Sequence, residues 1–236
     1  MQSKAVASTL LNIVMFCGVY AVVGRFALML AIPPGYATAI FPSSGIAVAA
    51  LLIWGYRLWP GIFIGSLLLN IGVSIELSPL TAAEFQIALA VATGATLQAL
   101  AGAWFVQRVI GFPTSLSKEK DIILFMLMAG PVACVISASF GVSSLFLSDV
   151  IPGSSYVYSW FTWWVGDTTG VLVVTPLMFI AFAQPRQIWR SRRYAVALPL
   201  LLLLVMAIVA FIWVSKWEHE RRLFEFKQIT TDTVTT

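Results

Sequence analysis

Seven long apolar segments follow one another along this chain of 236 residues, and they limit what it can fold into. A helix needs about 20 mostly apolar residues to cross a membrane. The connections between the segments are short, the first being Pro33-Pro34-Gly35. The sequence therefore predicts an all-α fold, a polytopic membrane bundle of seven transmembrane helices, over residues 6–31, 36–54, 58–75, 82–109, 122–147, 156–183 and 195–215.

The composition agrees with a chain that has lipid as its solvent. Hydrophobic residues make up 60% of the sequence and charged residues only 10%, whereas a soluble domain is about one quarter charged. The first apolar segment follows Lys4 and continues to about Ile32, which is longer than the roughly 7–15 apolar residues of a signal peptide. We expect it to be kept as the first span.

Basic residues alternate between the two sides of the predicted bundle. The first, third and fifth connections lack Lys and Arg, and their charges are Glu76 and Asp149. Under the positive-inside rule this alternation predicts the N-terminus inside and, after seven spans, the C-terminus outside. The small net charge of +4 is explained by this placement and does not indicate nucleic-acid binding. The basic residues of the other side are Lys4, Arg57, Arg108, Lys118, Lys120, Arg186, Arg190, Arg192 and Arg193.

The tail that begins at Lys216 is charged and contains no Pro or Gly. We expect the seventh helix to continue through it as an extracytoplasmic stalk, since no stop signal separates them. This divides the chain into a transmembrane domain over residues 1–215 and a stalk over 216–236 that starts a further domain, cut short here. A frayed terminus is the alternative.

Polar residues of several predicted helices lie at a similar depth in the outer half of the membrane. A charged side chain there is costly unless it faces protein and finds a partner. Arg25 is the only basic residue inside a span, which makes it the obvious partner for Asp167. One hypothesis is an outward-facing pocket, and the other is a buried ion pair that only holds helices together. The candidate ligand-binding or switch residues are Arg25, Pro42, Ser43, Ser44, Asn70, Trp164, Asp167 and Thr168.

Small residues recur at helical spacing in the fourth segment. They predict close packing of this helix against its neighbours, because small side chains let helix backbones approach. The residues are Ala88, Ala92, Ala95, Ala99 and Gly102.

Catalytic and metal-binding motifs are absent from the sequence. It contains no phosphate-binding loop motif, no HExxH and no nucleophile-elbow motif in a suitable context. The single histidine, His219, lies in the tail, and Cys17 and Cys134 form no CxxC pair. We therefore predict that this chain is not an enzyme and has no metal or other cofactor.

Two motifs resemble one known family. The stretch from Phe41 to Ile71 has Phe-Pro-x-x-Gly, a Gly and basic turn, Trp59-Pro60-Gly61 and a terminal Asn70. The second motif, W-x-G-D-x-x-G, runs from Trp164 to Gly170 and is followed by a proline. Both are similar to segments of the MASE1 family of bacterial membrane sensory domains.

The resemblance implies an input module joined to a histidine kinase, a diguanylate cyclase or a phosphodiesterase. Seven spans fit members in which an extracytoplasmic sensor of the CHASE type follows. The expected location is the bacterial inner membrane, crossed many times. The expected partners are a small-molecule or lipid ligand or a partner membrane protein, together with membrane lipids and a second copy in a homodimer, and not nucleic acid.

Two other functions stay open from the sequence. A small-solute transporter or channel needs a site that is reachable from both sides, but the inner half of the predicted bundle is mostly apolar. A purely structural membrane anchor needs no ligand site at all.

Overall fold

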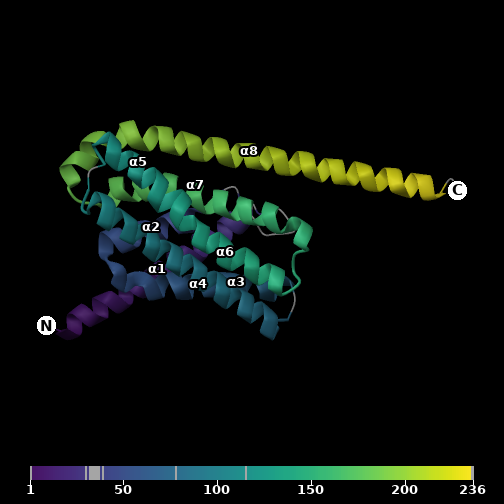
Figure 1. The fold of residues 1–236 in the computed structure, drawn as a ribbon, viewed down its shortest axis with the longest axis horizontal. Coiled ribbons are helices and arrows are strands. Elements are labelled where there is room, and N and C mark those ends of the chain that lie inside the picture. The colour runs from purple at the N-terminus through teal and green to yellow at the C-terminus, as the bar shows by residue number, and fades with distance from the viewer. Residues whose placement is uncertain are drawn as a thin grey trace.

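Helices account for nearly all of the residues that the computed structural model describes, which are 2–29, 31, 38, 40–77, 79–114 and 116–234. The side chains of residues 2–6, 77, 211–212 and 214–234 lie outside that description. Figure 1 shows the helices side by side as a bundle, with α8 along one flank. They are α1 (Gln2–Leu28), α2 (Pro42–Trp54), α3 (Trp59–Leu77), α4 (Ala82–Phe105), α5 (Glu119–Leu127), α6 (Ala133–Leu147), α7 (Tyr156–Phe182) and α8 (Arg186–Val234).

Six stretches within the described residues are long and apolar enough to cross a membrane. The chain is therefore a multi-pass integral membrane protein. One of the six stretches combines α5 and α6 through the π-helical turn η3 (Met128–Val132), and another extends α4 through η2 (Val106–Ile110). The expected all-α fold is confirmed, but the expected seven full-length spans are six and one short apolar helix, α2.

The prediction that the second span starts at Tyr36 is wrong. α2 starts at Pro42 and has 13 residues, which gives a length of about 20 Å against about 30 Å of hydrocarbon. Thr38, Ile40 and Phe41 are not helical. Proline suits the first helical position because its missing N–H would be unsatisfied there, and it disfavours helical backbone in the residue before it. The predicted Pro33-Pro34-Gly35 connection lies outside the described residues.

Other helix boundaries follow ordinary capping chemistry. Thr81 and Glu84 form a reciprocal capping box at the start of α4, in which each side chain accepts from the other residue's backbone N–H. α2 ends at Gly55, whose φ of 97° favours glycine. Pro131 lies inside η3, where its carbonyl accepts a hydrogen bond of 2.7 Å from Nε1 of Trp164. Pro176 lies within α7, which continues through it as one helix.

α2 lies in the middle of the bundle. Its residues from Ser43 to Leu52 are all buried, between α7, α4 and α1. The small residues of α4 that predicted close packing, Ala88 to Gly102, are also buried, and α4 packs against α3 and α6. The core is therefore built around a short central helix.

α8 differs from the other helices because its apolar stretch, residues 194–210, contains no buried residue. The helix is attached near its start, where Trp189 is buried and packs against Phe179 of α7, with ring centroids 5.7 Å apart. α8 starts at Arg186, earlier than the predicted 195, because the basic residues before the apolar stretch are helical too. It continues without a break to Val234, as expected for a stalk. Figure 1 shows that the N-terminus and the far end of α8 lie at opposite ends of the bundle.

Candidate functional site

A cavity of about 160 Å³ lies between α1, α3, α4, α6 and α7. Its rim includes Val150, which is 44% exposed, and its buried polar residues include Asp167, which is 7% exposed. The segment before α2 forms part of its floor. The residues that line it are Tyr20, Leu28, Thr38, Phe41, Ser66, Leu69, Asn70, Val73, Ser74, Glu84, Ile87, Ala88, Val91, Ala95, Ser137, Leu145, Val150, Trp163, Gly166 and Asp167.

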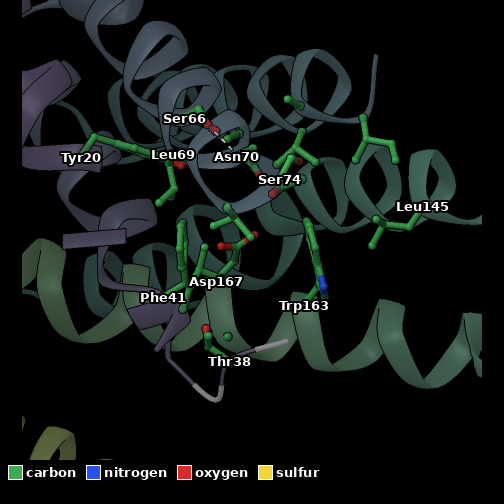
Figure 2. Close-up of a pocket in the computed structure, with 18 of the residues that line it drawn as sticks. Tyr20, Thr38, Phe41, Ser66, Leu69, Asn70, Ser74, Leu145, Trp163 and Asp167 are labelled. Atoms are coloured by element: carbon green, nitrogen blue, oxygen red, sulfur yellow. Dashed lines mark hydrogen bonds between the residues drawn. The ribbon is translucent and has the colours of Figure 1, made fainter. Parts of the chain in front are cut away.

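Asp167 projects from α7 into the middle of this cavity. Figure 2 shows its carboxylate between Tyr20 and Phe41 on one side and Trp163 on the other. The hydroxyl of Ser137 on α6 is placed to donate a hydrogen bond to it. No residue whose side chain the structure describes forms an ion pair with Asp167. A buried carboxylate therefore faces a cavity with one neutral donor beside it.

The expected pairing of Arg25 with Asp167 is wrong. The Arg25 guanidinium forms an ion pair with Glu76 at the end of α3, and both side chains are partly exposed, 37% and 57%. Arg25 does not line the cavity among its described residues. The depth of a residue along its helix gave no information on the direction of its side chain, and α1 turns Arg25 towards α3.

The predicted residues at the start of α2 lie beside the cavity and are used by the fold. The Ser43 hydroxyl donates to the carbonyl of Tyr20 at 2.9 Å. The Ser44 hydroxyl donates to the backbone carbonyls of Phe41 and Asp167, at 2.7 and 2.9 Å. Pro42 is the first residue of α2. The two serines hold the start of α2 against α1 and α7.

Trp164 and Thr168 face away from the cavity, towards η3 and α6. Trp164 donates to the carbonyl of Pro131 and is stacked on Trp160, with ring centroids 6.2 Å apart. The Thr168 hydroxyl is buried without a conventional hydrogen-bond partner among the described residues. The thiol of Cys134 lies beside it. Both residues belong to the packing behind Asp167.

Asn70 and Asp167 are the two predicted residues that the structure brings together in the cavity. Asn70 donates through Nδ2 to the carbonyl of Ser66 at 2.8 Å. Sequence reasoning missed the aromatic residues of the wall, Tyr20, Phe41 and Trp163. Aromatic residues are common in membrane helices, and one signal for Phe41 was available, since it opens the Phe-Pro-x-x-Gly motif.

Comparison with protein families gives a match to MASE1 over residues 13–224. The chain belongs to the MASE1 family. No curated protein and no solved structure matches it. MASE1 is a non-catalytic membrane sensory domain, typically the input module of bacterial signalling proteins. The matched region extends past the last span into the charged segment that begins at Lys216.

The two MASE1 motifs noted in the sequence meet in space. The Phe41 N–H donates to the carbonyl of Gly166 at 2.9 Å. A side chain at Gly166 would overlap the carbonyl oxygen of Thr38, and one at Gly170 would overlap that of Phe41. A side chain at Gly45 would in turn overlap the carbonyl of Gly170. The glycines of both motifs therefore let the start of α2 dock backbone to backbone on α7, about 15 Å along that helix. We call this contact the α2–α7 joint (Thr38–Gly45 on one side, Gly166–Gly170 on the other).

Metal-ligating residues do not cluster in this MASE1 domain. Within the described residues, no group of three or more His, Cys, Asp and Glu side chains is placed to hold a metal ion.

Proposed function

We propose that this MASE1 domain receives its stimulus in the cavity above Asp167 and transmits it through α7 to α8. The observation that carries the proposal is that three residues belong both to the cavity wall and to the α2–α7 joint. Thr38, Phe41 and Gly166 line the cavity and also form the α2–α7 joint. A molecule that fills the cavity thus contacts the joint directly.

The transmission step follows from packing. The joint has little freedom to deform gradually, because its glycines allow no extra atoms between the two backbones. An occupant that fits one arrangement of α7 better than another shifts the population towards that arrangement. α7 is followed directly by α8, and Phe179 of α7 packs against Trp189 of α8. A displacement of α7 is in this way passed to the long helix that leaves the bundle.

The same proposal includes the orientation of the domain in the membrane, the domains that follow it and its dimeric state. The charge alternation along the chain supports the N-terminus inside and the C-terminus outside a bacterial inner membrane. α8 then enters an extracytoplasmic domain of the CHASE type, and a histidine kinase, diguanylate cyclase or phosphodiesterase domain produces the response. The exposed apolar stretch of α8 is in keeping with a homodimer in the lipid bilayer.

Filling the cavity tests the proposal. Val73 lines it from α3, whereas Ile75 on the same helix is 58% exposed and does not line it. In the full-length signalling protein we expect Val73→Phe to lock output on or off at normal membrane abundance, while Ile75→Phe behaves like the wild type. The measurement is output activity divided by the amount of protein in the membrane. Wild-type output and response in Val73→Phe would contradict the proposal.

The short second helix supports one rival function. Transporters often bind their substrates at helices that do not cross the membrane in one piece, and α2, with 13 residues, is too short to cross it by itself. Transport also requires access from the other end of the bundle, where Leu51, Val106 and Phe179 are fully buried in the core. Uptake of a solute by vesicles that contain this protein, lost in Val73→Phe, would favour the transporter.

A further inference from the structure

The charged residues on the cavity wall are all acidic. Among the described residues that line it there are two carboxylates, Asp167 and Glu84, and no Lys, Arg or His. Arg25, the basic residue inside a predicted span and the countercharge that the sequence suggested, forms an ion pair with Glu76. Glu84 is already used, since it caps the start of α4 through Thr81. A phosphorylated or carboxylated solute would find no basic partner on this wall.

Asp167 is the centre of this negative charge. An ionised carboxylate away from water is costly unless an opposite charge and hydrogen bonds compensate for it. The Ser137 hydroxyl beside it is a neutral donor, and no described side chain supplies the charge. An occupant with a protonated amine would supply both the charge and further N–H donors, at the place where Figure 2 shows the carboxylate exposed to the cavity.

The rest of the wall suits the same kind of molecule. Asn70 uses its Nδ2 on the carbonyl of Ser66, so its Oδ1 is an acceptor for an ammonium group. The rings of Tyr20, Phe41 and Trp163 surround Asp167, and aromatic faces attract cations. The cavity holds far more than the roughly 10–15 Å³ that one water needs, and its 160 Å³ is suited to a small molecule.

We infer that the cavity selects a small organic cation, an amine of one ring or a short chain, which Asp167 binds through its ammonium group. This inference rests on the proposed function, because it names the chemical class of the stimulus for the same cavity. Anionic solutes are excluded by the two carboxylates, and neutral solutes leave Asp167 without a countercharge.

A charge series of similar molecules tests the inference. The probes are 2-phenylethylammonium, 2-phenylethanol and phenylacetate, each added to the purified full-length protein in lipid nanodiscs. Equilibrium dialysis of the radiolabelled amine measures binding, and the other two compounds compete with it. We expect the amine to bind at millimolar concentration or below, the alcohol to bind about tenfold more weakly, and the acid not to compete.

Substitutions locate the charge. We expect Asp167→Asn to weaken binding of the amine by about a hundredfold or more, because it removes the countercharge while keeping the size of the side chain. Asp149→Asn is the matched control, since it is the same substitution at an exposed acidic residue that does not line the cavity. It should bind the amine like the wild type. If Asp167→Asn does not fold, the charge series on the wild-type protein decides alone.

Three outcomes would overturn the inference: the alcohol or the acid binds as tightly as the amine, Asp167→Asn keeps wild-type affinity, or no probe binds at millimolar concentration. These are distinct from failure of the proposed function. If neutral probes bind equally well and Val73→Phe still locks output, the cavity receives the stimulus and only its charge class is wrong.

Discussion

At the scale of single residues, the two charges inside the membrane segments serve different purposes. Arg25 has its carboxylate partner, Glu76, at the partly exposed end of α3. Asp167 is buried beside Ser137, with its carboxylate turned into a cavity. An exposed ion pair contributes at most about 1 kcal/mol, whereas a buried carboxylate without a countercharge reduces stability. Asp167 is therefore a residue that the fold tolerates and does not need.

Because Arg25 and Asp167 do not touch, their effects on stability should be independent. We expect Arg25→Gln and Asp167→Asn to change the free energy of unfolding additively, within about 0.5 kcal/mol. Asp167→Asn by itself should be neutral or stabilising, because it replaces a buried charge by a neutral group of the same size. The measurement is unfolding of the purified protein in mild detergent by added denaturant. A double variant that recovers stability lost in both single variants would show that the two charges do pair.

The sequence predicted Asp167 and Asn70 as cavity residues because a polar side chain inside a span must face protein. It could not predict the partner of Arg25. Depth along a helix follows from counting residues, but the direction of a side chain depends on the rotation of the helix about its axis. A helix with apolar residues on every side gives no hydropathy signal for this rotation. The sequence placed Glu76 in the connection after the third span. In the structure Glu76 lies in the last turn of α3, where it pairs with Arg25.

At the scale of helices, the α2–α7 joint is the most demanding contact in the bundle. Gly45, Gly166 and Gly170 each lie where an added side chain would overlap a backbone carbonyl of the other segment. Thr175 of α7 adds a hydrogen bond of 3.0 Å to the carbonyl of Gly45. Backbone atoms cannot move aside as flexible side chains can, so the joint requires glycine at these positions.

Gly170→Ala should therefore destabilise the protein strongly. Its Cβ would overlap the carbonyl of Phe41 and crowd the Ser44 hydroxyl, and overpacking of this kind costs about 1–3 kcal/mol or more. Gly72→Ala in α3 is the matched control, since an added Cβ there has nothing within 4 Å. It should be neutral or stabilising by up to about 1 kcal/mol. Thermal unfolding of both variants in nanodiscs compares them, and equal effects would mean that the joint is not tightly packed.

The sequence predicted the existence and approximate position of the long spans well, because about 20 apolar residues in a row have few other uses. It failed at α2. Hydropathy extended the second span back to Tyr36, although Phe41-Pro42 carried a helix-start signal that was given less weight. The docking of α2 on α7 could not be predicted from either segment alone, since the reason for each glycine lies in the other segment.

At the scale of the whole molecule, α8 is the element that leaves the bundle. It is attached to α7 near Trp189 and runs on as one helix past the other end of the bundle (Figure 1). A continuous helix passes on rotation and translation over its whole length, because each residue turns the next by about 100° and advances it by about 1.5 Å. Under the proposed function, the orientation of α8 would carry the signal.

Insertions into α8 should affect output with the period of a helix. In the full-length protein, seven alanines inserted after Trp213 return the downstream helix to within about 20° of its original direction. Two inserted alanines turn it by about 200°. We expect near-normal response for the seven-residue insertion and loss of response for the two-residue insertion, measured as output per amount of membrane protein. Output that declines steadily with the length of the insertion would instead mean that orientation is unimportant.

The α2–α7 joint also fixes an order of events during synthesis. Ser44 and Asp167, which it connects, are 123 residues apart in the chain, so at about 5–20 residues per second the ribosome needs several seconds to provide the second half of the contact. α2 is too short to cross the membrane by itself. Until α7 is made, the N–H of Phe41 also lacks its acceptor, the carbonyl of Gly166, and lipid cannot replace it. The insertion machinery must shelter this segment until α7 emerges. The second crossing of the membrane is thus completed only after the segment that forms α7 has begun to appear. A ribosome that stalls before that point leaves a product that cannot finish its own insertion.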